Sequence, residues 1–346
     1  MTTTDPLRAV ATLYHAYFTG LILTVASRRG PKDAGQFVFK TFRHQHEEKF
    51  LSSLEKLGLD GLPHAVLAAQ YHYLSNRIGG VQVEYMYESD AKAWVRFPHP
   101  RWLYEGTALC AVPLEVSHGF LNGWYAQNGV SLNNPRLGFV CTSQDMDGQY
   151  GLAGYFLEHD RDLAPEERLR FAPGEEPPLF DAAAAPQLDP AVWPADRLRK
   201  ANRNYAMEYI KTSLPELIAL FGPAEGGHLG NLAGQLVAKQ FHAQTAGLLG
   251  IAGDDAAAFG AYMRAMAEAQ GDSAEVKPDG DGVRVRQSGW RLMRGRRNLP
   301  PAVFDAWNGL WQGALSSHNR FLAIEVLRRM DYGDDCFEWR IRPRAG

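Results

Sequence analysis

The chain has 346 residues, of which 45% are hydrophobic and 22% charged, and its formal net charge is −3. This composition is ordinary for a globular protein of two domains or one large domain, whose core forms without disulfide bonds. Acidic and basic residues are mixed along the chain without a polybasic run, which excludes the usual signature of a nucleic-acid-binding protein.

The apolar stretch at residues 9–26 contains no Asp, Glu, Lys or Arg and approaches the length of a membrane span. It nevertheless holds polar residues such as Thr12 and His15, and it lacks the cleavage pattern and strongly basic start of a signal peptide. The corresponding stretch in the second half of the chain is plainly charged. We therefore expect a buried helix of a soluble protein that does not cross a membrane.

The first part of the chain predicts, in order, helices at 6–28, 32–58 and 63–78, strands at 81–87, 91–97 and 107–112, a helix from Pro113, and strands at 137–143 and 151–158. Residues 162–200 contain seven prolines, a density that excludes long helices and central strands, so we expect an extended linker there. The second part predicts helices at 202–220, 228–250 and 254–269, and strands at 282–287, 289–293, 321–327 and 336–342.

Two parts of the sequence repeat each other. A stretch that opens with Gly30 and closes at Gly61 returns at a constant offset of 192 residues, from Gly222 to Gly253. The ends of the two parts also correspond in the same order. We therefore predict two diverged copies of one α/β unit, at 1–161 and 201–346, joined by the linker 162–200. Helices on one face of a mainly antiparallel sheet make the fold class α+β.

Histidine is concentrated in the first copy, which favours that copy as the active one and the second as its structural partner; drift in composition is the other interpretation. Eight of the eleven histidines precede the linker. In the helix at 32–58, His46 falls between Phe42 and Phe50 on the apolar face, with Glu47 near the edge of that face. An inward imidazole needs a partner, so His46 could bind a metal, act as a general base, or donate to a backbone carbonyl. His72 projects away from the apolar stripe of its helix, and we expect it to be exposed.

A cysteine and a histidine form a second candidate. His118 shares a helical stripe with Tyr125, and Cys110 lies on the preceding predicted strand. A strand end and the next helix can converge on one point, which suits a thiolate–imidazole pair or two ligands of a transition metal. The alternative is a buried cysteine without chemistry. The three cysteines, Cys110, Cys141 and Cys336, have no CxxC spacing, so we expect reduced thiols and a cytoplasmic protein.

The segment Pro98-His99-Pro100-Arg101-Trp102 is a candidate for substrate binding. Prolines on both sides of His99 fix its backbone, and the Arg101 guanidinium can hold a carboxylate through two hydrogen bonds. A structural turn is the other interpretation. With Tyr125, these side chains complete the predicted substrate-binding set His99, Arg101, Trp102 and Tyr125.

The closing segment of each copy carries a family resemblance. A helix, a strand, a turn that ends in Gly333-Asp334-Asp335-Cys336 and an alternating strand resemble the L-2-amino-thiazoline-4-carboxylic acid hydrolase family. The first copy has Asp147 to Gly151 in the same place, and Cys110 is similar to a cysteine of that family. Small-molecule-binding domains of the 4-vinyl reductase type have a similar ending. The resemblance implies hydrolysis of a carbon–nitrogen bond in a small cyclic amidine or amide.

The leading hypothesis is an enzyme whose site lies near His46, Cys110 and His118, around a divalent zinc, manganese or iron ion. Water bound to the metal would attack the substrate while Glu47 or a histidine moves protons. The alternatives are a non-catalytic binding or sensor module, and an iron- or haem-dependent lyase or oxidoreductase. A small-molecule ligand is expected in each case, in a monomer or a homodimer.

Overall fold

The computed structural model describes residues 4–98 and 106–344, and its helices and antiparallel sheets confirm the predicted α+β class. The chain divides into two compact units. Unit 1 combines Met1–Thr24 with Asn202–Gly346, and unit 2 is Val25–Ala201. The first helix therefore begins in unit 1, whereas the sequence pattern places all of it in the predicted first copy.

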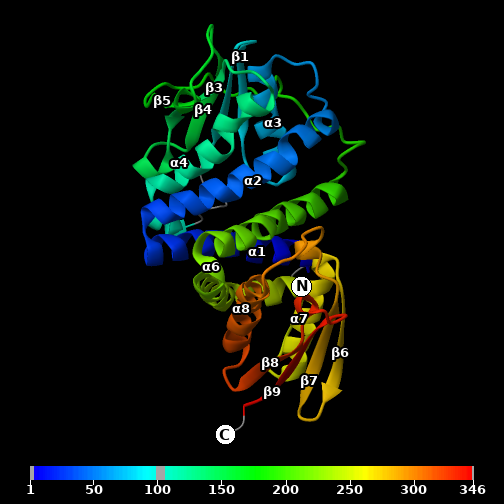
Figure 1. Ribbon diagram of the computed structural model, residues 1–346. Coiled ribbons are helices and arrows are strands. Elements are labelled where there is room, and N and C mark those ends of the chain that lie inside the picture. Colours follow the sequence, from blue (N-terminus) through cyan, green and yellow to red (C-terminus); the bar gives the residue numbers. More distant parts are fainter. Residues whose placement is uncertain (1–3, 99–105, 345–346) are drawn as a thin grey trace. The chain divides into compact units, whose positions relative to one another are not determined.

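Unit 2 builds a sheet of five strands with helices on one face (Figure 1). The strand order is β1-β2-β4-β3-β5, antiparallel except for the parallel pair of β3 and β5. Its elements are α2 (Pro31–Leu57), α3 (His64–Ile78), β1 (Glu84–Ser89), β2 (Lys92–Phe97), η2 (Gly106–Ala111), α4 (Leu114–Gly123), η3 (Tyr125–Gln127), α5 (Asn128–Ser131), β3 (Leu137–Ser143), η4 (Asp145–Asp147), β4 (Leu152–Glu158), η5 (Pro165–Glu167) and β5 (Leu169–Phe171).

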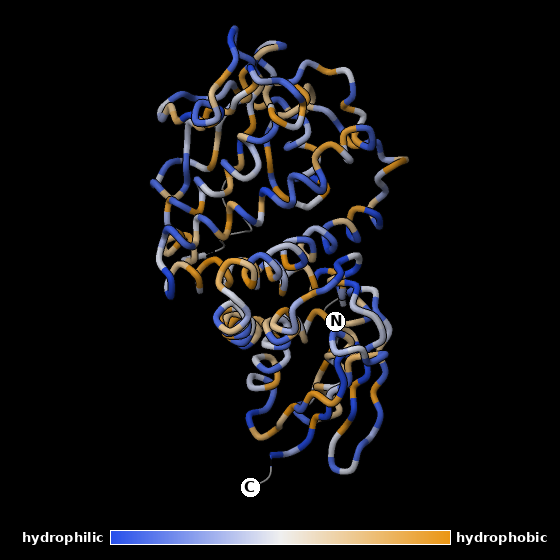
Figure 2. Tube along the Cα trace, in the orientation of Figure 1, coloured by the Kyte–Doolittle hydropathy of each residue, from blue (hydrophilic) through white to orange (hydrophobic). Residues whose placement is uncertain are grey.

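Unit 1 builds a sheet of four antiparallel strands in the order β6-β7-β9-β8. Hydrophilic and hydrophobic residues alternate along β7, as expected of a sheet with one face toward a core (Figure 2). Its elements are most of α1 (Pro6–Arg29) and α6 (Ala195–Leu249), then α7 (Ala256–Gln270), β6 (Ser273–Asp279), β7 (Gly282–Ser288), η6 (Arg291–Met293), α8 (Pro301–His318), β8 (Leu322–Arg328), η7 (Met330–Tyr332) and β9 (Phe337–Pro343).

The N-terminal helix α1 is held by hydrogen bonds inside unit 1. Tyr14 donates to the amide oxygen of Gln270 and accepts from the indole N–H of Trp307, each at 3.0 Å. Tyr17 donates to the carbonyl of Ala306 at 2.8 Å. By length and composition α1 alone among the described helices could cross a membrane, yet 61% of its most apolar window is buried.

The two units repeat one order of elements, as expected of two copies. β1, β2, β3 and β4 correspond to β6, β7, β8 and β9, and both sheets place the equivalent strands in the same order. Gly30 and Gly222 take positive φ angles of 95° and 80°, which glycine adopts easily, and each precedes a proline that starts a helical segment.

In each unit two helices also cross at a glycine, where there is no room for a side chain. A Cβ atom on Gly123 of α4 would meet the carbonyl oxygen of Phe39 in α2. In the equivalent place, a Cβ atom on Gly309 of α8 would meet the carbonyl oxygen of Asn231 in α6. The helices of each pair approach closely because these residues are glycines.

Two predicted strands are wrong. The expected strand at 107–112 is the short 3-10 helix η2, which buries none of its residues. The expected strand at 289–293 is loop and 3-10 helix η6, and the true partner of β7 is β6. β6 escaped prediction because it is an edge strand with exposed polar residues and a proline, Pro278, so it has no clear apolar alternation.

The proline-rich stretch does more than link two copies. β5 pairs with β3, and α6 already begins at Ala195. Residues 172–187, which we call the covering segment, lie beside the sheet face that points away from the helices. On that outer face an apolar cluster receives Ala172 and Phe180; its buried members are Met86, Trp94, Val140 and Tyr155.

Candidate functional site

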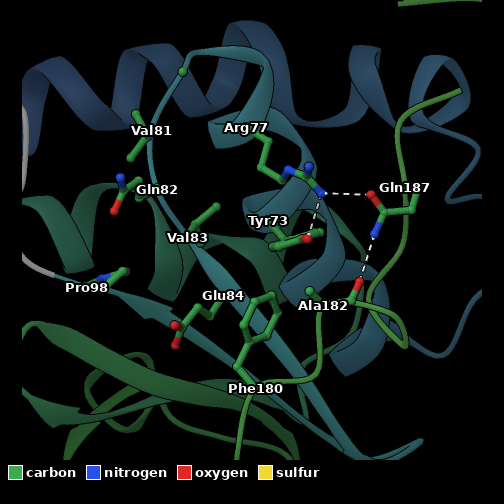
Figure 3. Close-up of a pocket in the computed structure, with 11 residues that line it drawn as sticks. Tyr73, Arg77, Val81, Gln82, Val83, Glu84, Pro98, Phe180, Ala182 and Gln187 are labelled. Atoms are coloured by element: carbon green, nitrogen blue, oxygen red, sulfur yellow. Dashed lines mark hydrogen bonds between the residues drawn. The ribbon is translucent and has the colours of Figure 1, made fainter. Parts of the chain in front are cut away.

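The candidate site is a hollow of about 560 Å³ in unit 2, between the end of α3, the start of β1 and the covering segment (Figure 3). Tyr73 and Arg77 project into it from α3, one turn of helix apart. Phe180 and Gln187 come from the covering segment. The covering segment therefore forms one wall of the hollow.

Arg77 provides a cation at the wall of the hollow. Its Nη1 donates to the hydroxyl of Tyr73 at 2.8 Å and to the amide oxygen of Gln187 at 3.2 Å. The guanidinium carbon also lies 5.2 Å from the centre of the Tyr73 ring. All these partners are neutral, and within the described ranges Arg77 has no ion pair with a carboxylate. The guanidinium thus keeps its charge available at the surface of the hollow.

The remaining wall is mainly apolar, with Gln82 and one carboxylate as its polar side chains. Val81 and Val83 line the hollow and are nearly buried, at 8% and 7% exposed. Glu84 also lines it, but its Oε2 accepts from Nε of Arg96 at 2.5 Å, so its charge is compensated. The hollow thus combines an apolar surface with the charge of Arg77.

His46 lies inside unit 2, as its position between phenylalanines predicts. It is 1% exposed, stacks on Phe50 with ring centres 4.7 Å apart, and has Nε2 2.9 Å from the hydroxyl oxygen of Ser131. Its Nδ1 is buried without a hydrogen-bond partner among the described residues. Burial, together with the nearby charge of Arg43, lowers the pKa of His46 to about 3. A neutral core imidazole bonded to Ser131 accounts for these observations.

His72 is buried, and the expectation that it is exposed is wrong. Its ring stacks on Tyr125, with centres 4.0 Å apart, and on Phe156, at 5.4 Å, and these two rings also stack on each other. Its Nε2 lies 2.9 Å from the amide nitrogen of Asn128. Burial, with a smaller effect of His46, lowers the pKa of His72 well below its ordinary value. A single apolar stripe failed to predict this because α3 is covered on more than one side.

Tyr125 lies at the centre of the same aromatic core, and its side chain is 1% exposed. Besides His72 it packs on Phe139, with ring centres 4.6 Å apart. The structure therefore places Tyr125 in the core, away from the hollow residues, although the sequence suggests it as a substrate-binding residue.

The structure does not assemble the predicted metal ligands. Cys110 is exposed on η2, where a strand was expected, whereas His118 is half-buried on α4 with its ring centre 4.6 Å from that of Phe171. Glu47 is exposed on α2. Across residues 4–98 and 106–344, no three His, Cys, Asp or Glu side chains form a group that could hold a metal ion.

The predicted segment of His99, Arg101 and Trp102 lies outside the described residues. Its neighbour in the chain, Pro98, lines the hollow. The sequence offered no signal for Arg77, because a helix-terminal arginine becomes a site residue only when distant segments meet it.

Comparisons with protein-family models, with curated proteins and with solved structures found no match. The candidate site therefore stands on the geometry of the hollow.

Proposed function

We propose that unit 2 binds a small organic anion in the hollow, with the anionic group paired to Arg77. The observation that carries this proposal is a guanidinium with neutral partners at the wall of an apolar hollow. Arginine holds carboxylates and phosphates through charge-assisted hydrogen bonds, which are stronger than those between neutral groups. The volume of the hollow also lies within the usual range of small-molecule sites.

The other wall residues divide the work of binding. Tyr73 holds the guanidinium in place, because its hydroxyl accepts a hydrogen bond from Arg77 and its ring lies against the guanidinium. Val81, Val83 and Phe180 offer apolar contact to the body of the ligand. We expect an elongated molecule with an anion at one end and an apolar or aromatic body, because charge and apolar surface lie on different parts of the wall.

In this proposal the chain is a cytoplasmic protein that binds a small molecule. The free thiols of Cys110, Cys141 and Cys336 support a reducing compartment. Two sequence-based predictions stay predictions: hydrolysis of a carbon–nitrogen bond, and a bound metal. The predicted catalytic residues do not meet in one site among the described residues.

Calorimetric titration tests this proposal with benzoate, 2-naphthoate and decanoate, each compared with its neutral amide. We expect at least one acid to bind and its amide to bind more weakly. Arg77→Met should weaken binding of the acid about tenfold to a hundredfold, because a hydrogen bond to a charged group contributes about 1.5–3 kcal/mol.

The matched control is Arg136→Met, which removes an exposed arginine of unit 2 that pairs with Glu158 away from the hollow. This variant should bind as the wild type does. No binding by any of the three acids, or equal loss in both variants, would contradict the proposal.

A further inference from the structure

Unit 1 contains a second concentration of positive charge, where α6, the end of α7 and η6 meet. Arg203 is 7% exposed and donates from Nη1 to the carbonyl of Ala269 at 2.6 Å. Its Nε and Nη2 both donate to the amide oxygen of Asn204, at 3.2 and 2.8 Å. Nη2 of Arg291 approaches that same oxygen at 3.5 Å. Two guanidinium groups thus share one neutral acceptor.

Asp272 attracts Arg291 electrostatically but forms no ion pair with either guanidinium. Asp272 accepts from the backbone N–H of Arg291 at 2.9 Å through Oδ1, and from the amide of Gln287 at 3.1 Å through Oδ2. Neither of its oxygens accepts from a guanidinium of the pair. Among the described residues, Arg203 and Arg291 form no ion pair within 4 Å.

The helix end compensates part of this charge. Ala269 lies in the last turn of α7, whose carbonyls carry a partial negative charge, equivalent to about half an elementary charge. Two full positive charges exceed that amount. Arg203 is nearly buried, while Asn204 and Arg291 are only partly buried, so the Asn204 side of the junction is open to an ion from solvent.

We infer that the Arg203–Asn204–Arg291 junction of unit 1 binds a small oxyanion, such as inorganic phosphate or a carboxylate. The anion would accept hydrogen bonds from Arg291 and from the N–H groups of Arg203 that face solvent. It would lie beside the Asn204 amide oxygen, the neutral acceptor that the two guanidinium groups share. Guanidinium groups match the geometry of both kinds of oxyanion.

Thermal unfolding of the full chain in inorganic phosphate or acetate tests the inference, with sodium chloride at equal ionic strength as the reference. In the wild type, the melting temperature should rise with phosphate or acetate concentration above that reference, because an ion that binds only the folded state stabilises it. The anion that gives the larger rise identifies the ligand class. No rise with either anion would overturn the inference.

Two variants make the test specific. Arg291→Gln should weaken the apparent affinity for the anion at least tenfold. Asn204→Asp supplies the missing negative charge from the protein, so it should raise the melting temperature in chloride and remove the further rise in phosphate or acetate. Arg320→Gln is the matched control, since Arg320 is another arginine of unit 1 and stacks on Phe321; it should respond as the wild type does. An unchanged response in Asn204→Asp and Arg291→Gln would overturn the inference even if both fold normally.

Discussion

The two sheets differ most on the faces that point away from their helices. In unit 2 this outer face is apolar, and the covering segment packs Phe180 against its cluster. In unit 1 the corresponding face carries ion pairs, such as Arg284 with Glu338 at 3.4 Å, and the Arg284 side chain stays 42% exposed. One order of elements thus supports two surfaces, and the hollow lies where a covering segment meets the apolar one.

The largest expected difference between the units follows from these two faces. Trp94 is 2% exposed in the outer cluster of unit 2, so Trp94→Ala should lower the free energy of unfolding by about 3–5 kcal/mol. Arg284→Ala on the outer face of unit 1 should cost much less, because its ion pairs are exposed and screened by solvent. Urea unfolding measures both values. Similar losses in the two variants would refute the contrast between the faces.

Buried histidines should make both units sensitive to acid. Burial lowers the pKa of His46 and His15 to about 3 and that of His242 to about 4, and it lowers the pKa of His72 well below its ordinary value. The folded state therefore disfavours the charged imidazole. Stability is complete above the unfolded pKa of about 6.5 and falls as the pH drops from there toward the folded values.

The size of this effect can be assigned to one residue. Each such histidine contributes up to about 1.4 kcal/mol per pH unit below pH 6.5. His46→Phe should therefore reduce the stability lost between pH 7 and pH 4.5 by about 2 kcal/mol, as measured by urea unfolding at both values. The loss of the Ser131 contact cancels in this difference. The same pH dependence in wild type and variant would exclude His46 as a contributor.

The close helix crossings should respond alike in both units. Gly123→Ala and Gly309→Ala each place a Cβ against backbone, so each should lower the free energy of unfolding by about 1–3 kcal/mol. Gly247→Ala is the control, because a Cβ there meets nothing within 4 Å in the helix α6. It should be neutral or stabilise by up to about 1 kcal/mol. A loss confined to one unit would show that the crossings are not equivalent.

The smallest expected effect concerns the covering segment. Gln187 accepts from Arg77, so Gln187→Ala removes a competitor of the ligand and should strengthen binding of the acid about threefold. Gln82→Ala is the control, since Gln82 lines the hollow without a described hydrogen bond to Arg77. Calorimetric titration compares the two. Weaker binding in Gln187→Ala would mean that Gln187 supports the ligand directly.

Local patterns in the sequence predicted most of the fold. Glycine–proline pairs at Gly30 and Gly222 marked the starts of the two repeated stretches, and the matching ends of the two parts located β3, β4, β8 and β9. The 107–112 segment misled because its apolar residues form the 3-10 helix η2, in which none is buried, and not a strand. Periodicity is evaluated one element at a time. It therefore failed to predict β6, because the apolar and polar residues of that strand alternate only weakly.

The candidate site was harder to predict. The inward position of His46 followed from helix geometry, but its bond to Ser131 joins residues 85 positions apart. His72 looked exposed because a helical stripe reveals one covered face only. Arg77 meets Gln187 across 110 positions, and no local pattern encodes such a meeting.

Hydrogen exchange with and without the bound acid is the most direct test of the claim that the hollow of unit 2 is a binding site. With the strongest of the three acids bound, exchange should slow at the end of α3, from Tyr73 to Glu84, and in the covering segment around Phe180 to Gln187. The strands β8 and β9 of unit 1 should exchange as before. Protection only in unit 1, or no protection around Arg77, would contradict the account.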